Sequence, residues 1–311
     1  MGQLVDGIWR TGWYEPDQKG AFQRPEAKFR GQPKVIEPGR YHLYVSLACP
    51  WAHRTLITRA LRGLESAISV TVVDPRMSDD GWSFRPEDPD PIAGAKLLRD
   101  VYLRADAKYT GRVTVPVLWD RVENTIVNNE SREVMRILDV ACAKLAEAPL
   151  VDTLAPEDLR AEIDRTLDAI YKPINNGVYR AGFAGKQSAY EHAVGELFEA
   201  LAHWDGVLAT RPFLCGDRIT EADIALFTTL IRFDLVYYSH FKCNVRRLRD
   251  HANLWRFTRR MYQHPGIGPT CDLDHIKVHY YWSQTTVNPT RIVPLGPTEY
   301  ASDLQELARD P

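Results

Sequence analysis

The sequence lacks any long apolar run and any excess of charge of one sign. No stretch approaches the roughly 18 consecutive apolar residues that a membrane-spanning helix needs. Lys and Arg number 39 and Asp and Glu 41, so a net charge of -2 provides no positive surface for nucleic acid or anionic lipid. The N-terminus also lacks the basic segment and apolar run of a secretory signal. We therefore expect a cytoplasmic protein that binds neither membranes nor nucleic acid.

Cysteine is scarce, and its arrangement excludes a disulfide framework. The 311 residues contain five widely spaced cysteines, Cys49, Cys142, Cys215, Cys243 and Cys271. An odd number leaves at least one thiol free. Cys271, His275 and His279 have the four-residue spacing of metal ligands on a helix, but the run offers no clear fourth ligand, so no metal is predicted. No glycine-rich phosphate loop follows a predicted strand, so no nucleotide cofactor is predicted either.

The first half of the chain predicts alternating strands and helices. Residues 1–40 are rich in Trp, Gly and Pro without regular periodicity, which indicates an ordered extension rather than a domain. Residues 41–49 alternate like a strand, residues 50–64 have helical spacing, and residues 68–74 form a second predicted strand. These three elements predict a βαβ unit with parallel strands and a right-handed crossover.

The next segment completes a thioredoxin-like order of elements. A long loop rich in Gly, Pro and Asp, residues 75–94, precedes a short predicted helix at residues 96–105. Residues 114–120 and 124–128 are predicted to pair as a hairpin, and a helix opens at Asn129-Glu130-Ser131. The resulting order β-α-β, α, β-β-α is the thioredoxin layout.

Beyond about Pro149 the strand signals stop and amphipathic helices take over. They are predicted near residues 156–171, 188–209, 221–236, 248–262 and 271–283. Thr220 and Asp223 form a variant of the capping box, which we assign to folding. The predicted organisation is an extension at 1–40, a thioredoxin-like domain at 41–149, an all-helical domain at 150–284 and an extended tail at 285–311.

Cys49-Pro50-Trp51-Ala52, at a predicted strand-to-helix junction, is the clearest chemical signal. A thiol at a helix N-terminus faces unpaired backbone N–H groups and the positive end of the helix dipole, which favour the thiolate. Because Ala52 stands where a dithiol motif has its second cysteine, a mixed disulfide on Cys49 requires an external thiol, for which glutathione is the obvious candidate. The alternative is that Cys49 is a small buried apolar residue.

Other residues support a site around this thiol. Thioredoxin-like domains place a cis-proline opposite the active thiol, and Val115-Pro116 is in position to supply it, although a trans proline at a strand edge is the alternative. Glu130 and Ser131 open a predicted helix whose N-terminus suits a carboxylate, a role compatible with simple capping. In the helical half, Tyr179 stands in a predicted loop, and two Tyr-Tyr pairs end predicted helices. Packing in the core is the alternative for each tyrosine.

With these motifs assembled, the chain resembles the Xi class of glutathione transferases, the glutathionyl-hydroquinone reductases. The resemblance covers nearly the whole chain and rests on RYHLYVSLACPWAHRT, GWSF, GRVTVPVLWD, IVNNES, NNGVYRAGF, RFDLVYYSHFKCN and VNPTRIVPLGP. It implies a thioredoxin-like domain that binds glutathione, an all-helical domain that binds the aromatic acceptor, and a homodimer.

The resemblance also implies roles for individual residues. Cys49 corresponds to the nucleophile, Tyr179 to a proton donor or acceptor, and Tyr237 and Tyr280 to tyrosines that hydrogen-bond near the thiol and help to keep it ionised. Within each Tyr-Tyr pair we choose the first member. The positions that correspond to glutathione contacts are Trp82, Arg112, Val113, Thr114, Val115, Glu130 and Ser131.

The expected activity is reduction of glutathionyl-hydroquinones with glutathione as co-substrate. Cys49 attacks the glutathione sulfur, the hydroquinone leaves, and a second glutathione releases oxidised glutathione. An Omega-like thioltransferase or dehydroascorbate reductase uses the same kind of monothiol site and is the alternative enzyme. A non-enzymatic binding protein of the same fold is the third possibility.

Overall fold

The computed structural model describes residues 1–306 and divides the chain into two compact units. The first unit contains residues 1–13 and 24–152, and the second contains residues 14–23 and the chain from Thr153 onward. This division differs from the expected one, because the N-terminal extension is shared between the units and the main boundary follows Asp152. The end of the expected tail, residues 307–311, lies outside the described residues.

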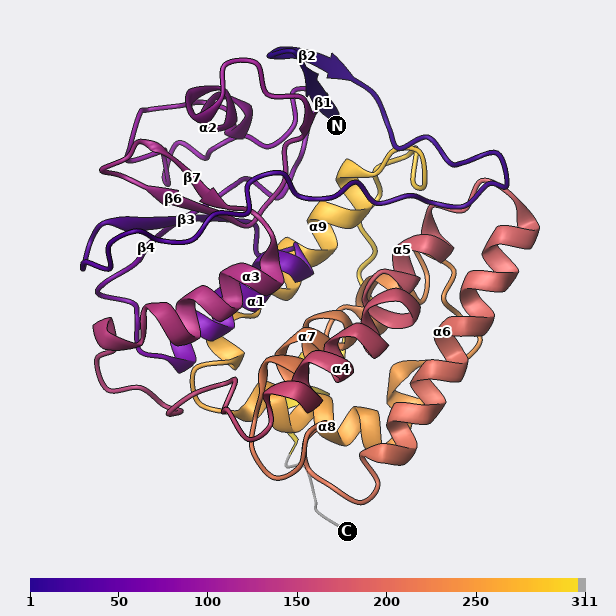
Figure 1. Cartoon of the computed structure of the whole chain (residues 1–311). Coiled ribbons are helices and arrows are strands. Elements are labelled where there is room, and N and C mark those ends of the chain that lie inside the picture. Colours follow the sequence, from indigo (N-terminus) through magenta and orange to yellow (C-terminus); the bar gives the residue numbers. More distant parts are fainter. Residues whose placement is uncertain (307–311) are drawn as a thin grey trace. The chain divides into compact units, whose positions relative to one another are not determined.

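The first unit is built on a four-stranded sheet in the order β4-β3-β6-β7 (Figure 1). Its strands are β3 (Tyr41–Val45), β4 (Ser69–Val72), β6 (Val117–Asp120) and β7 (Thr125–Asn128). β3 is parallel to β4 and antiparallel to β6, and β6 pairs with β7 in the predicted hairpin. Every residue of β3 is buried, as expected of an inner strand covered on both faces.

Helices cover both faces of this sheet. α1 (Pro50–Leu61) connects β3 to β4, which confirms the predicted βαβ unit with parallel strands. α1 and α3 (Ser131–Arg136) pack side by side, and α2 (Leu98–Ala105) covers the other face of the sheet (Figure 1). The unit therefore has the thioredoxin-like fold.

A buried carboxylate holds the long loop between β4 and α2. The hydroxyl of Tyr44 donates to Asp90 at 2.7 Å, and the backbone N–H groups of Ile92, Ala93 and Ala95 donate to the same carboxylate. Burial by itself raises the pKa of Asp90, but these hydrogen bonds outweigh it and the pKa lies below its usual value. The loop that carries Trp82 is therefore fixed from within.

The start of the extension forms a hairpin that the sequence analysis did not predict. β1 (Gly2–Val5) pairs with β2 (Ile8–Thr11) and also with β5 (Gly111–Arg112). Asp6 and Gly7, which connect β1 to β2, have φ angles of 48° and 78°. An Asp-Gly turn with two positive φ angles is typical of tight hairpins, so the signal was present in the sequence.

The second unit is helical. Its α-helices are α4 (Arg160–Ile170), α5 (Gly177–Gly182), α6 (Gln187–Val207), α7 (Glu221–Leu230), α8 (Ala252–Gln263), α9 (Leu273–Ser283) and α10 (Tyr300–Gln305). Every residue of α7 is buried, so this helix is central to the unit. Asp223 accepts from the backbone N–H of Thr220 at 2.8 Å and from its hydroxyl at 2.7 Å, which confirms the predicted capping box.

Two predictions for this unit were wrong. Tyr179 lies on α5 and not in a loop, because Val178, Tyr179 and Ala181 are buried and their packing outweighs the poor helix propensity of the Asn and Gly residues around them. The tail from residue 285 is not extended throughout, since it includes α10, where Tyr300 and Leu304 are buried.

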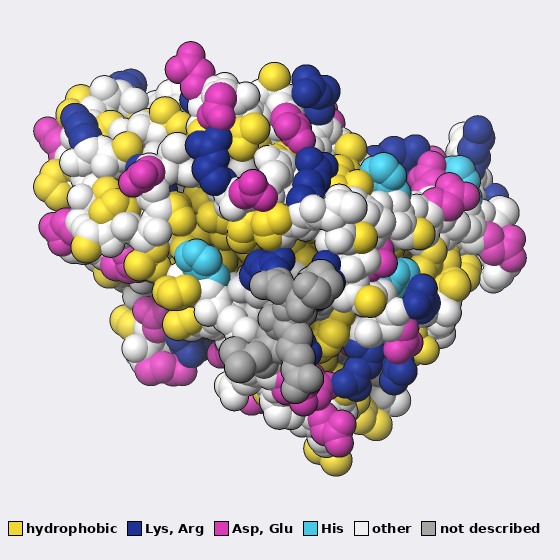
Figure 2. Space-filling model, turned by 90° about the horizontal axis from the view of Figure 1, so that it is seen from below, with side chains coloured by type: hydrophobic (Ala, Val, Ile, Leu, Met, Phe, Trp, Pro, Cys, Tyr) yellow, Lys and Arg dark blue, Asp and Glu magenta, His cyan; other side chains and the backbone are white. Residues whose placement is uncertain are grey.

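No helix among residues 1–306 is both long and apolar enough to span a membrane. On the face drawn in Figure 2, Lys and Arg side chains are interspersed with Asp and Glu side chains, in keeping with the small net charge.

Candidate active site

Cys49 occupies the position that the sequence predicted, at the N-cap of α1. Its backbone is extended, its carbonyl accepts the N–H of His53 at 2.9 Å, and Pro50 takes the first helical position. The Cys49 Sγ atom lies 3.5 Å from the carbonyl oxygen of Val115. The Val115-Pro116 peptide bond is cis, as expected. The thiol and the backbone edge that precedes the proline therefore face each other within the first unit.

The other cysteines are unsuited to thiolate chemistry. Burial raises the pKa of Cys142 to about 12 and that of Cys271 to about 12. Burial also raises the pKa values of Cys215 and Cys243. All four thiols stay protonated near neutral pH, whereas Cys49 is half-exposed at a helix start.

Tyr102 of α2 connects two segments that correspond to glutathione contacts. Its hydroxyl donates to the carbonyl of Thr114 at 2.8 Å and accepts from the N–H of Thr114 at 3.2 Å. The same oxygen accepts from the side-chain amide of Asn129 at 3.0 Å. Asn129 is held in turn by Phe29, through two hydrogen bonds of 3.1 and 2.9 Å. One buried hydroxyl thus ties the residue before Val115 to the residue before Glu130.

The segment after Asn129 begins α3. Glu130 is the N-cap residue, and its carboxylate accepts from the N–H of Arg132 at 3.2 Å and from the Ser131 hydroxyl at 3.5 Å. The capping role is therefore present in the structure. Trp82 is buried, and its carbonyl accepts from the N–H of Leu98 at 2.9 Å.

Arg112 has a clear structural task. Its guanidinium donates to the carbonyl oxygens of Gly2 and Gly12, each at 3.1 Å, and to that of Trp13 at 2.7 Å. The side chain holds the N-terminal extension against β5.

Two arginines near the thiol were missed by the sequence analysis. The guanidinium carbon of Arg54 lies 4.5 Å from the ring centroid of Trp51, and that of Arg24 lies 4.9 Å from the same ring. Both thus bring positive charge to the first turns of α1. Arg54 lies within the ACPWAHRT motif and was visible in the sequence, whereas Arg24 reaches Trp51 from the extension.

Three tyrosines of the second unit share one hydrogen-bonded cluster. The hydroxyl of Tyr280 lies 2.6 Å from that of Tyr179 and 3.0 Å from that of Tyr237. All three side chains are buried. Burial raises the pKa of Tyr280 well above its usual value, and the two neighbouring tyrosines raise it further, while Arg232 lowers it. At neutral pH Tyr280 is therefore protonated.

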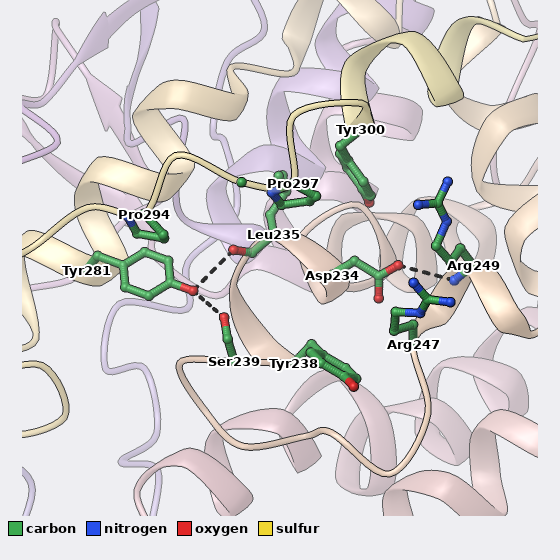
Figure 3. Close-up of a pocket in the computed structure, with 11 residues that line it drawn as sticks. Asp234, Leu235, Tyr238, Ser239, Arg247, Arg249, Tyr281, Pro294, Pro297 and Tyr300 are labelled. Atoms are coloured by element: carbon green, nitrogen blue, oxygen red, sulfur yellow. Dashed lines mark hydrogen bonds between the residues drawn. The ribbon is translucent and has the colours of Figure 1, made fainter.

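The second member of each Tyr-Tyr pair lies elsewhere. Tyr238 and Tyr281 line a cavity of about 300 Å³, whose lining also includes Asp234 and Arg249 (Figure 3). The Tyr281 hydroxyl contacts the hydroxyl of Ser239, and it lies 3.4 Å from the carbonyl of Leu235. Tyr237 and Tyr280 are thus the members of the two pairs whose hydroxyls lie in one hydrogen-bonded cluster with Tyr179.

The spaced residues Cys271, His275 and His279 do not form a cluster of ligands. The Cys271 thiol contacts the carbonyl of Ile267 at 3.7 Å, and both histidines are buried on α9. Within residues 1–306, no three His, Cys, Asp or Glu side chains are placed to hold a metal ion.

The comparisons with known proteins agree with this arrangement. Residues 48–141 match the family model "Glutathione S-transferase, N-terminal domain", and residues 187–260 match "Glutathione S-transferase, C-terminal domain". The chain is 50% identical to the glutathionyl-hydroquinone reductase PcpF of Sphingobium chlorophenolicum, over 96% of this chain and 97% of that protein. The chain belongs to the Xi class of glutathione transferases.

Solved structures of Xi-class proteins have the same fold over nearly the whole length. The Xi-class enzyme of Natrialba magadii is 53% identical, with a TM-score of 0.88, over 96% of this chain and 93% of that chain. The glutathione-bound structure of YqjG from Escherichia coli K-12 is 47% identical, with a TM-score of 0.85, over 95% of this chain and 96% of that chain. Glutathione is thus a ligand of YqjG, a relative that this chain resembles over nearly its whole length.

Proposed function

We propose that this Xi-class protein reduces glutathionyl-hydroquinones to hydroquinones, with glutathione as co-substrate and without a metal or nucleotide. The observation that carries the proposal is the position of Cys49, a half-exposed thiol at a helix N-terminus and 3.5 Å from the Val115 carbonyl. The family membership supports the choice of substrate, since PcpF is a glutathionyl-hydroquinone reductase.

The reaction has two balanced steps. In the first, the Cys49 thiolate attacks the sulfur of the thioether, an S–S bond forms, and the C–S bond breaks. The electron pair of that bond stays with the ring carbon, which takes up a proton, so the hydroquinone leaves reduced. In the second step, the thiolate of another glutathione attacks the mixed disulfide and releases oxidised glutathione and the Cys49 thiolate.

The tyrosine cluster is proposed to supply the proton for the first step. Tyr179 is assigned as the proton donor. Tyr280 lies 2.6 Å away and passes a proton to Tyr179, and Tyr237 supports Tyr280 at 3.0 Å. The raised pKa of Tyr280 favours this role, because the cluster then holds its protons until the hydroquinone departs. The resemblance to the Xi class assigns Tyr237 and Tyr280 a second role, which is to help to keep Cys49 ionised.

The glutathione itself is assigned to the first unit. The backbone of Val113, Thr114 and Val115 pairs with the peptide part of glutathione, while Glu130 and Ser131 receive its γ-glutamyl end. Trp82 packs against the glutathione. Arg112, which also holds the N-terminal extension, is assigned to the same site. Since the mechanism consumes reduced glutathione, we place the activity in the cytoplasm, where thiols are kept reduced. The expected homodimer is part of the proposal and is tested by sedimentation equilibrium.

The deciding experiment compares cysteine variants with glutathionyl-benzohydroquinone. Cys49→Ser is expected to abolish hydroquinone release, and mass spectrometry of the wild-type protein is expected to show a single glutathione adduct, on Cys49. The matched controls Cys142→Ser, Cys215→Ser, Cys243→Ser and Cys271→Ala keep most of the activity. Release by Cys49→Ser, or an adduct mainly on another cysteine, contradicts the mechanism. Faster turnover of dehydroascorbate than of the conjugate favours the Omega-like alternative.

A further inference from the structure

Residues 14–23, called the strap here, belong to the second unit, although the residues before and after them belong to the first. The strap runs beside α5 and the start of α6 (Figure 1). Just before it, Arg112 holds the carbonyls of Gly12 and Trp13 in the first unit. The N-terminal extension therefore contributes structure to both units.

The strap is a defined turn with its own hydrogen bonds. The carboxylate of Asp17 accepts from the N–H groups of Lys19 and Ala21, each at 2.9 Å, and from the Gln23 side chain at 3.1 Å. The N–H of Gly20 donates to the carbonyl of Asp17 at 2.8 Å. The Asp17 carboxylate thus closes the loop, as Asp does in many turns.

The strap docks on the segment between α5 and α6 by close backbone approach. The N–H of Gly185 donates to the carbonyl of Gly20 at 2.8 Å, and the Lys186 ammonium donates to the carbonyl of Gln18 at 2.8 Å. Gly20 has a φ of +81°, and a Cβ atom there would lie 2.7 Å from Lys186 Cγ and 2.9 Å from the Lys186 backbone nitrogen. Only glycine fits this position without displacement.

Two aromatic rings of the strap pack on Phe183, the residue that caps the end of α5. The ring centroids of Phe22 and Phe183 are 5.3 Å apart, and Tyr14 stacks on Phe183 at 5.9 Å. Phe22 is 5% exposed, so its ring is part of the core of the second unit.

Phe183 connects the strap to the tyrosine cluster through ring contacts. Its ring lies 5.8 Å from that of Tyr179 and 5.1 Å from that of Phe241. Phe241 in turn lies 5.4 Å from Tyr179 and stacks on Tyr237 at 5.4 Å. The half-buried Phe183 ring packs against the buried Tyr179 and Phe241, so a shift of Phe183 changes the packing around Tyr179.

We infer that the strap is a positioning element for the first step of the reaction, in which the hydroquinone leaves. It orients Tyr179 through Phe183. The inference rests on the proposed role of Tyr179 as proton donor. Phe22, Tyr14 and Phe183 are assigned as positioning residues, which act through Tyr179. Loss of the strap contacts therefore slows departure of the hydroquinone and leaves the attack of glutathione on the Cys49 mixed disulfide unchanged.

Gly20→Ala and Gly12→Ala form a matched pair for the test. Both add one methyl group to the extension, but no atom lies within 4 Å of a Cβ built at Gly12. In a single turnover with glutathionyl-benzohydroquinone, Gly20→Ala is expected to release hydroquinone about tenfold more slowly than Gly12→Ala, as expected for a misplaced catalytic group. The rate at which glutathione attacks the preformed Cys49 adduct is expected to agree within about twofold between Gly20→Ala and Gly12→Ala. Phe22→Ala behaves like Gly20→Ala, and Phe22→Leu restores most of the rate.

A second measurement requires no substrate. In a spectrophotometric titration of the tyrosines, the buried cluster of Gly20→Ala ionises at lower pH than that of Gly12→Ala, because loosened packing admits water. Equal release rates and equal titrations in the two variants overturn the inference. So does an equal slowing of both half-reactions in Gly20→Ala. If the wild-type protein releases no hydroquinone, the proposed function fails, and the titration alone then decides whether the strap positions the tyrosines.

Discussion

Removal of one hydroxyl, in Tyr102→Phe, tests whether the two segments proposed to bind glutathione depend on each other. The ring remains in place, and its centroid stays 5.0 Å from the centroid of the Tyr109 ring in an edge-to-face arrangement. Four hydrogen bonds disappear: two with the Thr114 backbone, one with the Thr114 hydroxyl and one with the amide of Asn129. The variant therefore separates the hydrogen-bonding role of Tyr102 from its packing role.

The size of the effect follows from the burial of these partners. A buried polar group that loses its partner costs about 1–3 kcal/mol. Asn129 is 6% exposed and bears that cost, whereas Thr114 is half-buried and water reaches it. We expect the free energy of unfolding to fall by about 1–3 kcal/mol in total. Because Thr114 and Asn129 are no longer held together, the Kd for glutathione is expected to rise about five- to tenfold, equivalent to about 1–1.4 kcal/mol.

Calorimetric titration of the free protein with glutathione measures this Kd, and urea denaturation measures the stability. Tyr41→Phe is the matched control, since the Tyr41 hydroxyl is also in the first unit but donates to the carbonyl of Val35, outside the site, at 2.6 Å. Tyr41→Phe is expected to lose stability and keep its affinity for glutathione. If Tyr102→Phe binds glutathione as tightly as Tyr41→Phe, the bridge between the two segments has no role in binding.

Three further predictions concern binding, chemistry and pH. Glu130→Ala and Ser131→Ala are expected to raise the KM for glutathione by an amount equivalent to about 1–3 kcal/mol, with little change in kcat. If the KM is unchanged, both residues only cap the helix. Tyr179→Phe is expected to fold and to release hydroquinone markedly more slowly than the wild type, although loss of its hydrogen bond to Tyr280 lowers the melting temperature. A release rate equal to that of the wild type contradicts its role as proton donor. Burial lowers the pKa of His240 from 6.5 to about 4, so the folded state binds fewer protons and loses stability as the pH falls from about 6.5 to 4. Asp223, with a pKa raised to about 6, has the opposite effect on stability below that pH. Urea denaturation should therefore show that the free energy of unfolding falls less with decreasing pH in His240→Gln than in the wild type.

The thiol site was predictable because its signals are local. Cys49 and Pro50 are adjacent, and a strand followed by a helix places a residue at the N-cap whatever the rest of the chain does. The capping box of α7 is local for the same reason, since Thr220 and Asp223 are three residues apart. The choice of Tyr237 and Tyr280, by contrast, followed the resemblance and a guess between neighbours.

Several of the missed features depend on contacts between distant residues. Tyr102 and Asn129 are 27 positions apart, and neither belongs to a motif with a chemical role. The division of the extension between two units depends on Phe22 meeting Phe183, and no periodicity in residues 1–40 indicates such a contact. The helix α5 was missed because burial stabilises a segment whose own composition favours a loop.

The sequence by itself determined which residues can carry the chemistry: one cysteine at a helix start, a proline that follows Val115, and tyrosines at the ends of helices. These are properties of residue type and short spacing, which the backbone geometry of strands and helices translates directly into position. The tertiary structure decided which hydroxyls form hydrogen bonds with one another, that Arg112 holds the extension, and that the strap packs on Phe183, which contacts Tyr179. Such pairings arise when the chain buries its apolar surface, and only the packed structure specifies which distant side chains then meet.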